Sequence, residues 1–180
     1  MIPKIIHYCW FGRKPLPADV EKYIKSWKHY CPDYEIIRWD ESNFDVTENE
    51  YCREAYDNKK YAFVADYVRL KVVYDYGGIY MDSDVEVVKN MDELLPYNVV
   101  LGYESDIGLM TGTYGACRNN SLIKIFLDYY NGRKFVMPDG SFDLTTNVVI
   151  ITNIIKNKYN YILDGKRNII DDGVLILPFD

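Results

Sequence analysis

The sequence predicts an α/β fold with a mixed central sheet and helices on both faces. Apolar segments of strand length alternate with segments of helical periodicity in the early part of the chain. At Gly77-Gly78 the apolar period changes from helical to two, as it does where a helix ends and a buried strand begins. The chain has 180 residues, 48% of them hydrophobic, which suits one domain with a sizeable core. We therefore expect a single domain over residues 1–180.

Turn residues and changes of period divide the chain into short elements. In order, we expect a strand at 3–9, a helix from Val20 that ends before Pro32, a strand at 34–39, a short helix capped by Thr47 that runs to Tyr56, a helix at 58–76, a strand at 79–88, a strand at 98–103, a loop and strand at 108–117, helices at 121–130 and 144–155, and a strand at 174–179.

The central helix and the strand that follows it carry the clearest chemical signal. Asn58 can cap the helix, and Gly77-Gly78 ends it. With a period of two, Asp82, Asp84 and Glu86 point to the same face of the strand. Like charges this close repel one another unless a cation lies between them, which suggests a divalent metal. Glu86 fits a solvated strand position better than a third ligand.

The D-x-D triplet means little by itself, because aspartate makes up about a tenth of the chain and chance supplies roughly two such triplets. Its context is more informative. Asp66 and Arg69 lie three residues apart on one helical face with Ala62 and Val73. They are either a surface ion pair or the wall of a polar site. The apolar character of that face favours the second interpretation.

Ligands of open α/β sheets bind beyond the carboxyl ends of the strands. Trp10 follows the first strand there, so it could converge with Asp66 and with Asp82 and Asp84. Core packing and stacking on a ligand are equally compatible with the position of Trp10. His7 lies within the apolar first strand and is expected to be a satisfied core histidine.

Bulk properties exclude several classes of function. A net charge of −6 without a basic run makes nucleic acid an improbable partner. Four widely spaced cysteines, without C-x-x-C, indicate free thiols and no zinc site: Cys9, Cys31, Cys52 and Cys117. We find no signal peptide and no integral membrane segment in the sequence, which predicts a cytoplasmic protein.

Three segments in this order carry a family resemblance: IPKIIHYCWFG, YAFVADYVRL and GGIYMDSDVEV. They resemble the DXD-motif glycosyltransferases of the family-32 type found in capsular polysaccharide clusters. These enzymes are related to yeast mannosyltransferases and, distantly, to clostridial glucosylating toxins. The resemblance implies a GT-A fold, a nucleotide-sugar donor, a divalent metal (Mn2+, or Mg2+) and retention of anomeric configuration.

The resemblance also implies roles for single residues. Trp10 matches the tryptophan that stacks on the donor base. Asp66 and Arg69 match the pair that holds the donor sugar and its phosphate side. Asp82 matches the aspartate near ribose, sugar and metal, and Asp84 the direct metal ligand. The implied catalytic set is therefore Asp66, Arg69, Asp82 and Asp84.

The resemblance also implies that the donor is a UDP-sugar, as in most of the family, and that the acceptor is a saccharide or a lipid-linked saccharide. A lipid-linked acceptor would lie at the inner membrane face, so the protein would bind there peripherally. Family members continue past the equivalent of Pro178 into a segment with histidine and tryptophan that closes over the diphosphate. Here the last apolar strand would have nothing to cover it. We therefore expect a domain that is truncated at its C-terminus.

Two other functions remain open. Phosphohydrolases of the haloacid-dehalogenase type also place D-x-D after an apolar strand, and NIIDDG at 168–173 resembles their later metal-binding aspartates. Their aspartate strand opens the domain, however, whereas here it comes later. The third possibility is a protein that binds a nucleotide sugar without transferring it.

Overall fold

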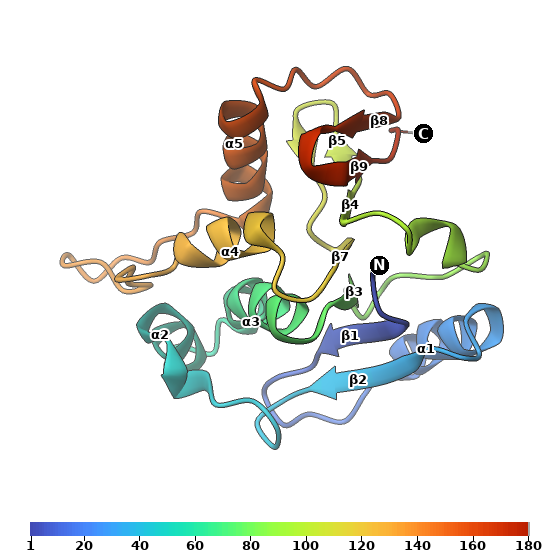
Figure 1. Ribbon diagram of the computed structural model, residues 1–180. Coiled ribbons are helices and arrows are strands. Elements are labelled where there is room, and N and C mark those ends of the chain that lie inside the picture. The colour runs from blue at the N-terminus through green and yellow to red at the C-terminus, as the bar shows by residue number, and fades with distance from the viewer. Residues whose placement is uncertain (180) are drawn as a thin grey trace.

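In the computed structural model, which describes residues 1–179, seven strands form one mixed sheet in the order β2-β1-β3-β7-β4-β9-β8 (Figure 1). The strands are β1 (Ile5–Cys9), β2 (Glu35–Trp39), β3 (Gly78–Met81), β4 (Val99–Leu101), β7 (Thr113–Ala116), β8 (Asn168–Ile170) and β9 (Val174–Ile176). β1 pairs in parallel with β2 and β3, and β4 pairs in parallel with β9, whereas β7 runs antiparallel to both β3 and β4. The predicted mixed α/β sheet is confirmed.

Helices cover both faces of this sheet. They are α1 (Ala18–Tyr30), α2 (Glu50–Asp57), α3 (Tyr61–Tyr76), α4 (Ser121–Asp128) and α5 (Asn147–Tyr159), with short 3-10 turns η1 (Val46–Glu48), η2 (Asp92–Leu94) and η3 (Asp171–Gly173). α1 packs on one face, and α2 to α5 lie on the other (Figure 1). A small hairpin of β5 (Tyr103–Ser105) and β6 (Gly108–Leu109) packs beside α5. Within residues 1–179 no helix combines the length and apolar character needed to cross a membrane.

Side chains alternate between the two faces of the sheet along each strand, and so contribute to two hydrophobic cores, one on each face. Ile79 and Met81 of β3 join the core under α1, whereas Tyr80 joins the core under α3. His7 of β1 is fully buried on the α3 side, where the indole N–H of Trp39 donates to its Nδ1 at 3.1 Å. Its Nε2 therefore carries the proton and donates to the Gly77 carbonyl at 2.7 Å. The predicted satisfied core histidine is confirmed.

Two details of the central segment differ from the prediction. Asn58 caps the end of α2, since its amide donates to the Glu54 carbonyl at 2.8 Å, and α3 begins only at Tyr61. The strand predicted to reach residue 88 ends at Met81, because the Asp82 carbonyl accepts a turn bond from the Val85 N–H. Asp82 and Asp84 therefore lie on a turn, with Glu86 after it, and not along one strand face.

Two further predictions need correction, and one strand was missing from the prediction. The cap of α2 is Asn49, whose side chain accepts from the Cys52 N–H, whereas Thr47 lies in η1. β8 was not predicted, because its three residues are too few to show a period. β9, expected to be uncovered, lies between β4 and β8 and is buried on both faces.

Candidate functional site

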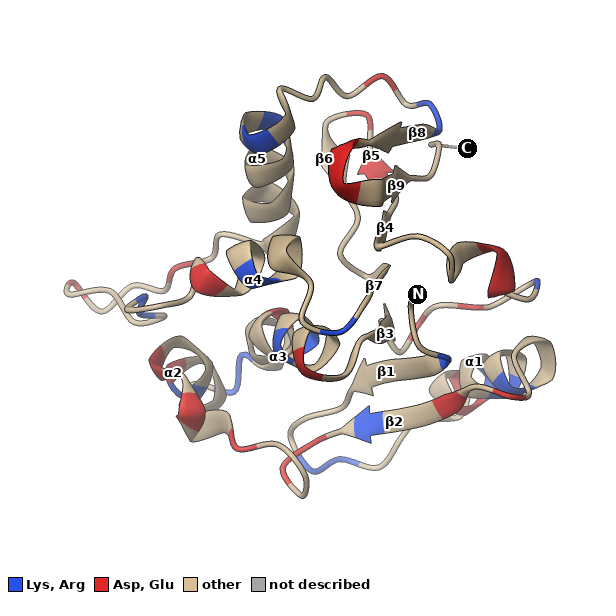
Figure 2. Cartoon of the chain, in the orientation of Figure 1, with Lys and Arg blue, Asp and Glu red and all other residues tan. Residues whose placement is uncertain are grey.

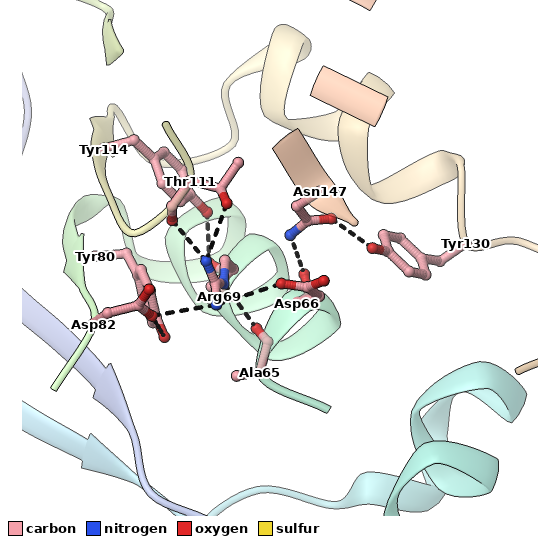
Figure 3. Close-up of polar contacts among 9 residues, drawn as sticks. All are labelled: Ala65, Asp66, Arg69, Tyr80, Asp82, Thr111, Tyr114, Tyr130 and Asn147. Carbon is pink, nitrogen blue, oxygen red and sulfur yellow. Dashed lines mark hydrogen bonds and ion pairs between the residues drawn. The ribbon is translucent and has the colours of Figure 1, made fainter. Parts of the chain in front are cut away.

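Arg69 is the centre of a buried polar cluster beyond the carboxyl ends of β1 and β3 (Figure 3). Its Nη2 lies 3.3 Å from Asp66 Oδ1 and 3.2 Å from Asp82 Oδ1. Its Nη1 donates to the carbonyl and the hydroxyl of Thr111 at 2.8 and 3.2 Å, and its Nε donates to the Ala65 carbonyl at 3.2 Å. Every nitrogen of the guanidinium thus faces a protein oxygen.

The helix α3 places Asp66 and Arg69 one turn apart, with side chains that are 12% and 7% exposed. Burial excludes the surface ion pair that the spacing alone allowed. A buried ion pair requires that the remaining polar atoms find partners. Here the loop before β7 supplies Thr111, and Tyr114 of β7 donates its hydroxyl to the Arg69 carbonyl at 2.8 Å.

A turn after β3 presents Asp82 and Asp84. The Asp82 N–H donates to the Gly112 carbonyl at 2.7 Å, which extends the pairing of β3 with β7 by one bond. The Tyr80 hydroxyl donates to Asp82 Oδ1 at 2.9 Å, and the Tyr80 ring lies under the Arg69 guanidinium, 4.8 Å from its centre. A Cβ on Gly112 would lie 2.8 Å from Asp82 Oδ2, so the absence of a side chain there leaves room for this carboxylate.

A second set of contacts holds Asp66 from the far side (Figure 3). Asn147, fully buried at the start of α5, donates its amide to the Asp66 carbonyl at 2.8 Å. Its Oδ1 accepts from the Tyr130 hydroxyl at 2.5 Å. Segments from four parts of the chain therefore meet around two adjacent helical turns of α3.

An open cavity of about 430 Å³ lies beside this cluster. The chemically relevant part of its lining is Trp10, Lys14, Arg69, Asp82 and Asp84. Asp66 does not line it and contacts it only through Arg69. The indole N–H of Trp10 donates to the Lys14 carbonyl at 2.8 Å, which fixes the ring and leaves its face for stacking.

Burial and charge set the protonation of the cluster. Burial raises the pKa of Asp66 and of Asp82, and the positive charge of Arg69 opposes both shifts. Asp84 raises the pKa of Asp82 further, because the two carboxylates repel each other. Burial lowers the pKa of Arg69, but Tyr80 and the two carboxylates outweigh it, so the pKa is raised and the guanidinium stays charged. Burial raises the pKa of Cys9, also in the cavity wall, to about 12, so it is no thiolate nucleophile at neutral pH.

The residues present fit a divalent ion bound together with a phosphate ligand. Within the described part of the chain, no three histidine, cysteine or acidic side chains form a metal-binding group. Asp82 and Asp84 supply two carboxylates at the cavity wall, with Glu86 exposed and outside it. Magnesium and similar hard ions are held in this way, by one or two carboxylates and by substrate phosphates.

The structure brings Trp10, Arg69, Asp82 and Asp84 to one cavity, as the sequence suggested, and places Asp66 behind Arg69. Their functional roles remain predictions. The sequence did not indicate Tyr80 as a partner of Asp82, although a period of two places both on one face. Thr111 and Gly112, in the loop before β7, position Arg69 and Asp82.

The second acidic motif lies elsewhere. Asp171 and Asp172 form the turn between β8 and β9, which lie four and three strands away from β3, or about 14–19 Å. β9 runs in the same direction as β3, and this turn precedes it, whereas Asp82 follows β3. The two motifs therefore occupy opposite ends of the sheet. A shared metal site of the phosphohydrolase type is not formed.

Comparison with known proteins supports a sugar-transfer site. Residues 17–101 match a family described as "Glycosyltransferase sugar-binding region containing DXD motif". The chain is 35% identical over 126 residues to inositol phosphoceramide mannosyltransferase 3 of Schizosaccharomyces pombe, covering 68% of this chain and 35% of that protein. It is 30% identical over 124 residues to mannosyl phosphorylinositol ceramide synthase SUR1 of Saccharomyces cerevisiae, covering 64% and 31%. The chain thus spans about a third of the length of these relatives.

The fold agrees with this comparison. The solved structure of the PaToxG glycosyltransferase is similar, with a TM-score of 0.67 and 20% identity, over 88% of this chain and 70% of that one. This similarity confirms the predicted GT-A-type fold. The narrower resemblance to family-32 enzymes of capsular clusters stays a prediction. Residues 17–101 are thus similar to the sugar-binding region of the DXD-motif glycosyltransferases, and the chain shares the fold of such an enzyme.

Proposed function

We propose that this chain is the donor-binding domain of a metal-dependent glycosyltransferase that retains anomeric configuration. The observation that carries the proposal is the cavity in which Trp10, Asp82 and Asp84 meet beside the buried Arg69. A flat aromatic face, a pair of carboxylates and a fixed cation are the parts that a base, a metal-bound diphosphate and a sugar require.

The proposed role of each residue follows from its position in or beside the cavity. Trp10 presents its ring face to the base. Asp82 and Asp84 would hold Mn2+ or Mg2+, which when bound offsets the negative charge that develops on the departing diphosphate. Arg69 keeps Asp82 in place, and Asp66, which lies behind Arg69 and outside the cavity lining, holds Arg69 in turn. Among residues 1–179, Asp82 and Asp84 are the only carboxylates in the cavity lining and both are assigned to the metal, so attack on the same face of the sugar is the mechanism we favour.

The donor and acceptor follow from different observations. The family resemblance favours a UDP-sugar, whereas the relatives' names indicate a mannosyl donor. The binding assay below therefore compares donors with different nucleotide bases. Those names also describe transfer to an inositol phosphoceramide, which supports a glycolipid as the acceptor class. Such an acceptor would require a protein that reaches a membrane surface, which agrees with the peripheral position expected from the resemblance.

Calorimetry with UDP-glucose, UDP-galactose, UDP-N-acetylglucosamine and GDP-mannose, each with and without MnCl₂, tests the proposal. Metal-dependent binding of one donor and its slow hydrolysis to the nucleoside diphosphate are expected. Asp84→Ala should abolish both without loss of stability, because Asp84 is exposed. Asp171→Ala, at an exposed aspartate at the far end of the sheet, is the matched control.

The outcomes separate the rival functions. Binding without hydrolysis or transfer would indicate a protein that only binds nucleotide sugars. Phosphatase activity that Asp171→Ala abolishes would indicate the phosphohydrolase. Absence of binding to all four donors would refute the proposed function of this domain.

A further inference from the structure

Lys14 belongs to the same cavity but has no role in the scheme above. It lies on the loop between β1 and α1, where Figure 2 shows a basic stretch, and it lines the cavity with Trp10, Asp82 and Asp84. Its side chain is exposed, and within residues 1–179 its ammonium group has neither a hydrogen bond nor an ion pair. A cation in a ligand cavity without a protein partner is available to an anionic ligand.

The loop holds Lys14 in place through its backbone. Its carbonyl accepts the Trp10 indole N–H, and the Gly12 N–H donates to Glu41 Oε1 at 2.7 Å. Gly12 has a φ of +96°, and a Cβ there would lie 2.5 Å from the Tyr61 ring. The backbone of Lys14 is therefore fixed beside the aromatic ring that the base would use.

Arg69 has no nitrogen left to bind the phosphates of the donor. Its three nitrogens already face oxygens of Ala65, Thr111, Asp66 and Asp82. A divalent ion would offset the excess of carboxylates over Arg69, but each phosphate of the donor brings further negative charge. Lys14 is the only other cationic residue in the described lining of the cavity.

We propose that Lys14 is a donor-binding residue whose ammonium group pairs with the diphosphate of the nucleotide sugar. This inference rests on the proposed function, since it needs a diphosphate in the cavity. Lysine suits the task because its flexible stem can follow a phosphate as a point charge.

The test compares Lys14→Gln with Arg13→Gln. Arg13 is the adjacent cation, but its side chain faces Tyr56 and Glu41. Calorimetry with UDP and with GDP, in the presence of MnCl₂, should show about tenfold weaker binding for Lys14→Gln. It should also show a smaller loss of affinity on adding NaCl, because one ionic contact is gone. Arg13→Gln should bind as the wild type does, and Lys14→Arg should recover most of the affinity.

Three results would overturn the inference. Wild-type affinity in Lys14→Gln would show that the diphosphate does not use this residue, while the proposed function would stand. An equal loss of affinity for the free nucleosides uridine and guanosine would place Lys14 at the base instead. If wild-type protein binds neither nucleotide with the metal, the inference falls together with the proposed function. All variants should melt as the wild type does, since both side chains are exposed.

Discussion

Gly112→Ala is the most direct test of how the site is built. The new Cβ would lie 2.8 Å from Asp82 Oδ2 and 3.5 Å from its Cγ. Ordinary contact begins near 3.4 Å, so the carboxylate has to move by about 0.6 Å. The backbone of Gly112 is outside the left-handed region, so the substitution adds no backbone strain of its own.

The expected cost to stability is small. Asp82 Oδ1 accepts from the Tyr80 hydroxyl and lies 3.2 Å from Arg69 Nη2, and both contacts would lengthen. The Asp82 side chain is 34% exposed, which lets the displaced carboxylate turn toward water. We therefore expect a loss of about 1 kcal/mol, which lowers Tm by about 3 °C in a chain of this length.

The expected cost to function is larger, because metal and diphosphate contacts depend on carboxylate position. Misplacement of a reacting or positioning group by about 1 Å costs as much as about 100-fold. Affinity for UDP or GDP with MnCl₂ should fall by about tenfold or more by calorimetry, and donor hydrolysis should fall at least as far. Gly102→Ala is the control, because its Cβ would meet only the flexible end of Met110, at 3.4 Å. Wild-type affinity in Gly112→Ala would refute the claim that this glycine sets the position of Asp82.

Three further substitutions or titrations test the fold around the site. Arg69→Met leaves two carboxylates without their cation and should cost about 3–5 kcal/mol in urea unfolding; a loss below about 1 kcal/mol would contradict the buried network. Burial lowers the pKa of His7 to about 4, from 6.5, so the unfolded chain binds the proton first as pH falls. Stability is then complete above about pH 6.5 and falls by about 3 kcal/mol on the way to pH 4. An NMR titration should find His7 still neutral at about pH 5, and a midpoint near 6.5 would contradict its burial. Gly78→Ala should destabilise by about 2 kcal/mol more than Gly140→Ala. Both glycines have positive φ, but only at Gly78 would the Cβ meet a carbonyl oxygen of β1, at 2.7 Å; equal losses would show that the close approach costs nothing.

The sequence by itself determined most of the elements and the motif. Its periodicities located β1, β2 and the five helices to within a few residues, because each has a regular apolar face or a clear cap or stop signal. The glycine pair after α3 and the two aspartates after β3 also follow from sequence, since both depend on local chemistry. The change of apolar period at Gly77-Gly78 located the start of β3, but the predicted strand ended seven residues later than β3 does in the structure.

Tertiary structure decided which side chains meet. Thr111, Tyr114 and Asn147 follow their partners in α3 by 42, 45 and 81 residues, and no local pattern marks them as partners of Arg69 or Asp66. The order of the strands, with β7 beside β3, brings Gly112 against Asp82. The same order keeps the second acidic motif at the opposite end of the sheet. Local periods record which face of an element is buried, but the partner across that face is set by strand order and by the packing of distant segments.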